Sequence, residues 1–207
     1  MAKLRTFTLY IVLPVAFGAV LFLAGFLQEF SGDEIPDAAR AAGVTLPLSE
    51  AHIVVSCQRM TLSLFSGDAL IKRYNIGYGR GPVGRITKRA GSTPIGNFTI
   101  IKKERRGDLI GHGSRFMMFD FPSLELADQA YEVGELSDED HEAIAAAHAS
   151  VSPPPFDTPL GGPVGIQGNF FFFLDRRFTD GNIALSNADI NELFEYVPVG
   201  TTVSIER

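Results

Sequence analysis

The chain has 207 residues, of which 45% are hydrophobic and 20% are charged, with 21 glycines and 12 prolines. This length suits one ordinary domain with a small appendage and argues against two full domains, while the composition excludes a disordered or coiled-coil protein. The formal net charge is −6, and a single cysteine, Cys57, excludes an internal disulfide, so cysteine usage does not identify the redox compartment.

The first feature in chain order is an uncharged apolar run, residues 6–27, which has about the length that a bilayer-spanning helix needs. Lys3 and Arg5 precede the run and acidic residues follow it, and positive residues tend to stay on the cytoplasmic side. We therefore predict a cytoplasmic N-terminus (1–5), a single-pass transmembrane signal anchor in the inner (cytoplasmic) membrane, and a body that faces the periplasm or extracytoplasmic space. The alternative is a cleaved signal peptide.

Residues 28–50 mix acids, alanines, glycine and two prolines, which predicts a linker with one short helical turn at Asp37 to Ala42. The predicted domain covers residues 51–207. It begins with two alternating hydrophobic runs joined through "SGD", the pattern of a β-hairpin. Further strands are predicted in "IGNFTIIK", "SRFMMFDF" and "TTVSIE".

Two helices are predicted from their capping residues. Ser137 precedes the alanine-rich segment "HEAIAAAHA", and Ser186 or Asn187 begins "SNADINELFEYV", which ends before Pro198. A proline- and glycine-rich loop, "VSPPPFDTPLGGP", lies between them. The fold class that we predict is a mainly β domain with a few helices, behind an N-terminal transmembrane helix.

Charge is strongly segregated along the chain. Residues 80–106 carry eight basic residues against one acid, Glu104, a net charge of +7. This segment is either a solvated loop face or a patch that attracts an anionic polymer or peptide carboxylates. We do not expect nucleic acid as a partner, because the predicted topology places the segment outside the cytoplasm. "GRGPVG" (79–84) matches a dinucleotide-binding pattern, but no helical pattern follows it, so we expect no nucleotide cofactor.

Candidate metal ligands and nucleophiles are few. His141 and His148 share one face of a predicted helix but lack a third ligand at a suitable spacing, so we expect no metal site. His112 lies in a loop without an identified partner. Cys57 is predicted to lie in the first strand as a small hydrophobic residue, because nothing near it in sequence would lower its pKa and make it a nucleophile.

Four segments taken together carry a family resemblance: "YNIGYGRGPVGRITKRAGSTPIGNFTI", "SRFMMFDFPSLELADQAYEVG", "GGPVGIQGN" and "FTDGNIALSNADINELFEYVPVGTTVSI". In this order they resemble the L,D-transpeptidase catalytic domain, the YkuD or ErfK type, over His52 to Glu206. The resemblance implies a β-rich fold outside the cytoplasmic membrane that acts on bacterial peptidoglycan without a cofactor. Active members cleave a tetrapeptide stem through a cysteine thioester and pass the acyl group to an amine.

The chain departs from the family pattern at two positions. One branch of the family has T-D-G-C-I-A-L where this chain has asparagine at the nucleophile, in the segment Thr179, Asp180, Gly181, Asn182, Ile183, Ala184 and Leu185. The family's I-H-G is replaced by Ile166, Gln167 and Gly168. An asparagine amide lacks the polarisable, ionisable sulfur of a thiol, and a glutamine does not take up a proton near pH 7. The ordinary mechanism is therefore untenable.

The first hypothesis is a pseudoenzyme, a membrane-anchored protein that holds peptidoglycan stem peptides or partners another cell-wall enzyme. The run Phe170 to Phe173 either lines its groove or forms a buried strand. An active transferase or peptide hydrolase with a nonstandard nucleophile or His112, and a plain structural module, are the alternatives. The residues expected to bind the stem peptide are Gln167, Gly168, Thr179, Asp180, Asn182 and Ala184.

Overall fold

The computed structural model describes residues 12–20, 33–84, 91–106, 113–168 and 176–207. The chain divides into two units, Met1–Glu34 and Ile35–Arg207. In the first unit residues 12–20 are helical with exposed side chains, whereas the predicted N-terminus 1–5 and most of the predicted anchor 6–27 lie outside the described residues. Within the described ranges, no helix is both long enough and apolar enough to cross a membrane.

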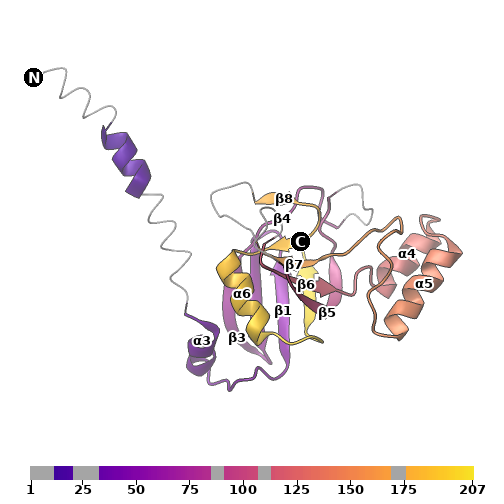
Figure 1. Cartoon of the computed structure of the whole chain (residues 1–207), viewed down its shortest axis with the longest axis horizontal. Coiled ribbons are helices and arrows are strands. Elements are labelled where there is room, and N and C mark those ends of the chain that lie inside the picture. The colour runs from indigo at the N-terminus through magenta and orange to yellow at the C-terminus, as the bar shows by residue number, and fades with distance from the viewer. Residues whose placement is uncertain (1–11, 21–32, 85–90, 107–112, 169–175) are drawn as a thin grey trace, which may run out of the picture. The chain divides into compact units, whose positions relative to one another are not determined.

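The second unit is built on a curled mixed β-sheet, which confirms the mainly β fold with a few helices (Figure 1). Among the described residues the sheet has eight strands, and β1–β10 and β7–β9 are its parallel pairs. In spatial order the strands are β3 (Ala69–Asn75), β2 (Thr61–Ser66), β1 (Ala51–Ser56), β10 (Thr202–Glu206), β5 (Gly96–Arg105), β6 (Arg115–Phe119), β7 (Gly165–Gln167) and β9 (Ile183–Ala184).

The predicted hairpin is confirmed as β2 and β3, which pair antiparallel across the turn at residues 67–68. Gly67 has a φ of 54°, a value that glycine adopts without strain. Alternation explains which face of the central strands is buried: Ile53 and Val55 of β1 face the core, as do Val203 and Ile205 of β10. Cys57 follows β1 instead of lying within it.

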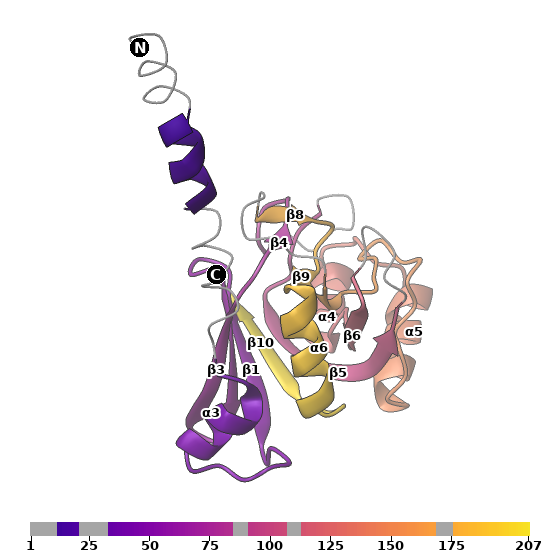
Figure 2. The ribbon, with the colours of Figure 1, turned by 60° about the vertical axis from the view of Figure 1, so that its left-hand side comes forward.

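Side-chain caps start three of the helices, α4 (Leu124–Glu132), α5 (Asp138–Ala149) and α6 (Asn187–Tyr196). Ser137 and Ser186 accept the backbone N–H three residues onward, which confirms both predicted starts. Ser123 caps α4 in the same way, although this helix was not predicted. The helices α4 and α5 lie side by side at the end of the molecule far from β3, with a small core of their own (Figures 1 and 2).

The remaining helix of the second unit, α3 (Ile35–Ala41), confirms the short helical turn predicted at Asp37 to Ala42 within the linker. Ile35 and Ala39, one helical turn apart, are fully buried and belong to the main core, together with Leu48. Residues 35–50 of the predicted linker are therefore largely folded onto the domain. The sequence did not predict this packing, because the segment has few apolar residues and these are buried only through contact with β3.

Helix α6 buries Ile190, Leu193 and Phe194 in the same core. It follows β9 directly, since the chain turns from Ala184 through Leu185 to the cap at Ser186. The packing of α6 in the core therefore fixes the position of the end of β9. A second, two-stranded parallel ladder of β4 (Tyr78–Gly79) and β8 (Arg177–Thr179) lies beside β9 and leads into it.

Candidate functional site

The family motif forms a tight turn between β8 and β9. The Thr179 hydroxyl donates to the Asn182 carbonyl oxygen at 2.6 Å and accepts from the Gly181 N–H at 3.3 Å. Gly181 has a φ of 117°, and a Cβ there would lie 2.7 Å from the Ser92 carbonyl oxygen. Only glycine suits this position, so the turn has one shape and presents Asn182 from a fixed backbone.

A buried threonine braces the motif turn from the opposite segment. The Thr93 hydroxyl donates to the Gly181 carbonyl oxygen at 3.1 Å and accepts from the Gly79 N–H at 2.9 Å. Thr93 is fully buried, and a Cβ on Gly79 would lie 2.3 Å from the Gly91 carbonyl oxygen. The "STPIGNF" element, noticed in the sequence only as a family marker, therefore holds the motif turn in place. Sequence reasoning gave Thr93 no role.

The two substituted positions meet in space. The Asn182 Nδ2 donates to Gln167 Oε1 at 2.8 Å, and Asn182 Oδ1 accepts from the Gly165 N–H at 3.1 Å. Parallel pairing of β7 with β9 places Gln167 opposite Ala184, and the Leu185 N–H donates to the Gln167 carbonyl oxygen. Gln167 is only 5% exposed, whereas Asn182 is partly exposed. We call Asn182 and Gln167 the amide pair.

Gly168 closes the end of β7 against the start of α6. A Cβ on Gly168 would lie 2.3 Å from Asn187 Oδ1 and 3.1 Å from Ile190 Cγ2, so a side chain at this position would require these two neighbours to move. The Gly113 Cα would lie 3.2 Å from the same Cβ position. The first turn of α6 is thus one boundary of the site, next to the amide pair.

Asp180 lies at the solvent side of the motif turn and forms an ion pair with Arg80 at 2.5 Å. Both side chains are more than 60% exposed, so the pair stabilises the fold by little. Arg177 Nη2 donates to the carbonyl oxygens of Arg80 and Gly81. These contacts hold the loop after β4 beside the motif.

Other described members of the basic segment also have partners. Lys103 Nζ donates to the Val197 carbonyl oxygen at 2.9 Å and lies over the Phe194 ring, and burial lowers its pKa. Lys102 pairs with Glu104 at 2.8 Å. For the described part of the basic segment 80–106, these contacts favour a solvated face whose charges are paired within the chain over an open patch that binds anions. Residues 85–90 lie outside it.

The structure gathers Gln167, Gly168, Thr179, Gly181, Asn182 and Ala184 around the ends of β7 and β9, and places Asp180 at their edge. The run Phe170 to Phe173 and His112 lie outside the described residues. His141 and His148 lie elsewhere: His141 Nε2 contacts Asp128 Oδ1 at 2.7 Å, and His148 Nε2 contacts the Pro122 carbonyl oxygen at 2.8 Å.

Cys57 is far from the site in the sheet. The strand that it follows, β1, is separated from β9 by four others, β10, β5, β6 and β7. The side chain is 2% exposed, and burial raises the pKa of its thiol to about 11. A thiol of this kind is protonated at neutral pH and has no access to the motif turn, as the sequence had indicated.

The curled sheet, the glycine-dependent motif turn and its paired strand ends define a domain of the L,D-transpeptidase-like class. The chain belongs to the L,D-transpeptidase catalytic domain family (YkuD), whose sequence model matches residues 50–205. No curated protein sequence gives a significant match.

Solved structures show the same fold. The helical cell shape determining protein Pgp2 of Campylobacter jejuni, in a mutant form, is 18% identical with a TM-score of 0.53, over 76% of this chain and 47% of that one. Bd1075 of Bdellovibrio bacteriovorus is 15% identical with a TM-score of 0.51, over 78% of this chain and 49% of that one. The chain thus spans about half of the length of these two structures, and the likeness concerns the fold.

Proposed function

We propose that this chain is a membrane-anchored L,D-transpeptidase-like protein of bacterial cell-wall (peptidoglycan) metabolism that does not transfer acyl groups and acts by binding. Its ligands are peptidoglycan stem peptides or a partner cell-wall enzyme. The observation that carries this proposal is the amide pair, in which Asn182 and Gln167 occupy the nucleophile and base positions and bond to each other at 2.8 Å.

The amide pair lacks the chemistry of acyl transfer. The nitrogen lone pair of Asn182 is delocalised into its carbonyl group, so it does not attack an acyl carbon, and neither amide takes up a proton near neutral pH. Asn182 Oδ1 is also engaged by the Gly165 N–H. Hydrogen-bonding groups held in this way suit recognition of peptide amides better than catalysis.

Family membership supports the ligand class, because L,D-transpeptidase domains act on peptidoglycan stems. The retained framework supports it as well: the glycine at the motif turn, the Thr93 brace and the close approach of Gly168 to α6 preserve the shape of the site. For the location, the apolar run 6–27 behind Lys3 and Arg5 supports an inner-membrane anchor with the domain on the periplasmic side.

The test uses the full chain in detergent with a disaccharide tetrapeptide and a free D-amino acid. Wild type is expected to bind the muropeptide, measured by calorimetry, and to give no exchange product by mass spectrometry. Asn182→Cys with Gln167→His is expected to restore exchange, and Asn182→Cys alone serves as the control without a base.

Each outcome has a definite meaning. Turnover by wild type would overturn the inactive assignment and favour the alternative, an enzyme with a nonstandard nucleophile. If wild type neither binds nor turns over muropeptide, stem recognition is excluded and only the version with a protein partner survives, which a pull-down from cell-wall enzyme preparations then tests.

A further inference from the structure

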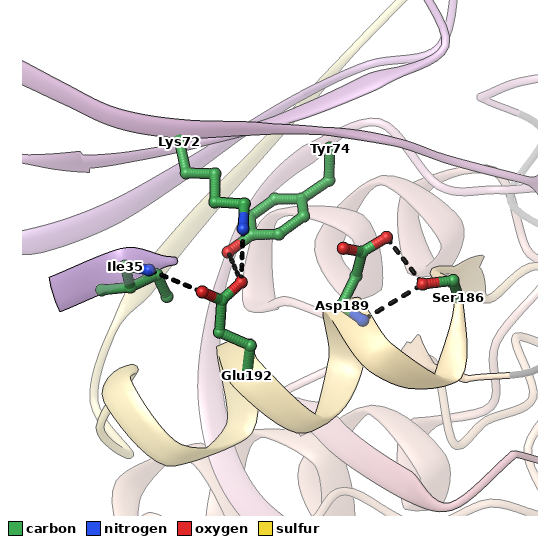
Figure 3. Close-up of polar contacts among 6 residues, drawn as sticks. All are labelled: Ile35, Lys72, Tyr74, Ser186, Asp189 and Glu192. Carbon is green, nitrogen blue, oxygen red and sulfur yellow. Dashed lines mark hydrogen bonds and ion pairs between the residues drawn. The ribbon is translucent and has the colours of Figure 1, made fainter. Parts of the chain in front are cut away.

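One largely buried carboxylate joins three elements that are distant in sequence. Glu192, in the middle of α6, accepts the Ile35 N–H of α3 at 2.5 Å through Oε1. Its Oε2 accepts from Lys72 Nζ at 2.8 Å and from the Tyr74 hydroxyl at 3.1 Å, both on β3 (Figure 3). The side chains of Glu192 and Lys72 are each 15% exposed, so this contact is largely shielded from water.

The contact with α3 has a physical reason. The Ile35 N–H is at the first residue of the helix and has no acceptor within it, and the positive end of the helix dipole favours a carboxylate there. Lys72 supplies the opposite charge that a largely buried carboxylate needs. Asp189 is the other carboxylate on this face of α6; it faces Ser186, and its pKa is raised, mainly by burial.

Glu192 also selects where α3 starts. The apolar side of the helix is already committed to the core, because Ile35 and Ala39 are fully buried and Ala38 packs beside them. Hydrophobic burial alone is not directional, whereas a hydrogen bond to one particular N–H sets the register of the helix. The carboxylate therefore fixes the residue at which the incoming chain joins the domain.

The attachment of α3 to the domain limits how far the domain can lie from the predicted membrane anchor. If residues 6–27 span the membrane, only residues 28–34 separate the anchor from α3, and seven extended residues reach at most about 25 Å. If the whole of 28–50 were free, its 23 residues would reach about 80 Å.

We propose that Glu192 is a latch that keeps the segment 35–50 on the domain and so confines the site to stem peptides close to the bilayer surface. The latch acts on the helix that also bounds the site, since α6 begins with Asn187 against Gly168. The distance argument rests on the anchor in the proposed function. The latch itself rests on the contacts of Glu192.

The first test measures hydrogen exchange of the full chain in lipid nanodiscs. Glu192→Gln removes the charge with little change of shape. The amides of residues 35 and 37–41 are expected to exchange about 10-fold faster, because charge-assisted hydrogen bonds are about twice as strong as neutral ones; residue 36 is a proline and has no amide hydrogen. Glu195→Gln is the matched control, as Glu195 lies on the same helix with an exposed side chain near Arg105. Tyr74→Phe, which removes one hydroxyl, is expected to give a smaller local increase.

Unchanged exchange of 35–41 in Glu192→Gln would overturn the latch. So would an equal increase throughout the domain, since Glu192 would then be an ordinary structural residue. If Glu192→Gln fails to fold, Tyr74→Phe decides the matter by the same criterion of a local increase at 35–41.

The second test measures the reach. A dye at Val133→Cys in a Cys57→Ser background, on an exposed position of the α4–α5 connection, reports energy transfer to labelled lipid head groups. Glu192→Lys places a cation against Lys72 and the start of α3, and should reduce the transfer toward that of a variant with about 20 Gly/Ser residues inserted after residue 32. Glu195→Lys should leave it unchanged.

A folded Glu192→Lys protein with wild-type transfer would exclude the confinement to the bilayer. If wild type itself does not enter nanodiscs, the anchor of the proposed function fails, and the exchange result at 35–41, measured then in solution, still decides the latch. The failure of the two proposals is therefore distinguishable.

Discussion

At the scale of single residues, the site depends on whether two amides act as a unit. Asn182→Ala would leave Gln167 Oε1 and the Gly165 N–H without their partner, which we expect to lower the free energy of unfolding by about 1–3 kcal/mol. The measurement is denaturant unfolding of the full chain in detergent.

A double-mutant cycle with Gln167→Ala isolates the pair. The double variant should lose about 1 kcal/mol less than the sum of the single variants, because the second substitution removes a group that is already unpaired. Strictly additive losses would show that the two side chains do not cooperate.

Cys57 gives a second prediction at this scale. Burial raises the pKa of its thiol to about 11, so at pH 8 the folded protein holds about 0.1% thiolate, against roughly a quarter in the unfolded chain. Alkylation by iodoacetamide, followed by mass, should be at least about 100-fold slower in the folded protein. The stability linked to the bound proton is present below about pH 8.5 and is lost as the pH rises toward 11.

Rapid labelling of native Cys57 would contradict this burial and reopen the case for a thiol nucleophile.

The sequence predicted best which residues make up the site, because the family motif states which side chain stands at each position. The acceptor for Asn182 Nδ2 follows from that motif together with strand pairing. The Gly165 N–H and the Thr93 brace do not follow, since they depend on backbone approaches that have no local signal.

At the scale of elements, α6 connects the amide pair, the core and α3. Asp189, in its first turn, has a raised pKa, mainly because of burial, while Ser186 and Lys72 act in the opposite direction. The stability that comes from its proton is therefore fully present below the unfolded value of about 3.9 and is lost as the pH rises through the folded value.

Asp189→Asn removes this titration. The free energy of unfolding of the variant, relative to wild type, should rise between pH 4 and pH 7, as measured by denaturant unfolding at both pH values. Glu192→Gln provides a comparison on the same helix. A relative stability that is independent of pH, or that falls over this interval, would contradict the raised pKa of Asp189.

Elements were predictable where their signal was local. Ser137 and Ser186 cap their helices with the side chains that the sequence shows, and the β2–β3 turn follows from glycine between alternating runs. The strands β7, β8 and β9 have only two or three residues each and exist through pairing with distant partners. Helix α4 also has a serine cap, but its buried residues are the alanines Ala127 and Ala130, whose small side chains are a weak sign of a buried face.

At the scale of the whole molecule, the family assignment concerns residues 50–205, whereas location depends on residues that lie mostly outside the described ranges. The segment between them was expected to be a linker, and its described part contributes Ile35, Ala39 and Leu48 to the core. The sequence did not reveal this because three apolar residues among acids and alanines are compatible with either state.

The last prediction concerns the anchor. The full chain expressed in bacteria should remain in the membrane pellet after alkaline carbonate extraction, because about 20 apolar residues partition strongly into a bilayer. A chain lacking residues 1–27 should be released, and it retains α3 and Glu192, so its fold can be compared through the exchange of amides 35–41. A reporter fused after Arg207 that is active only outside the cytoplasm should be active in the full chain. Release of the full chain by carbonate would contradict the anchor. A reporter active only in the cytoplasm would contradict the topology, and the stem peptides would then be out of reach.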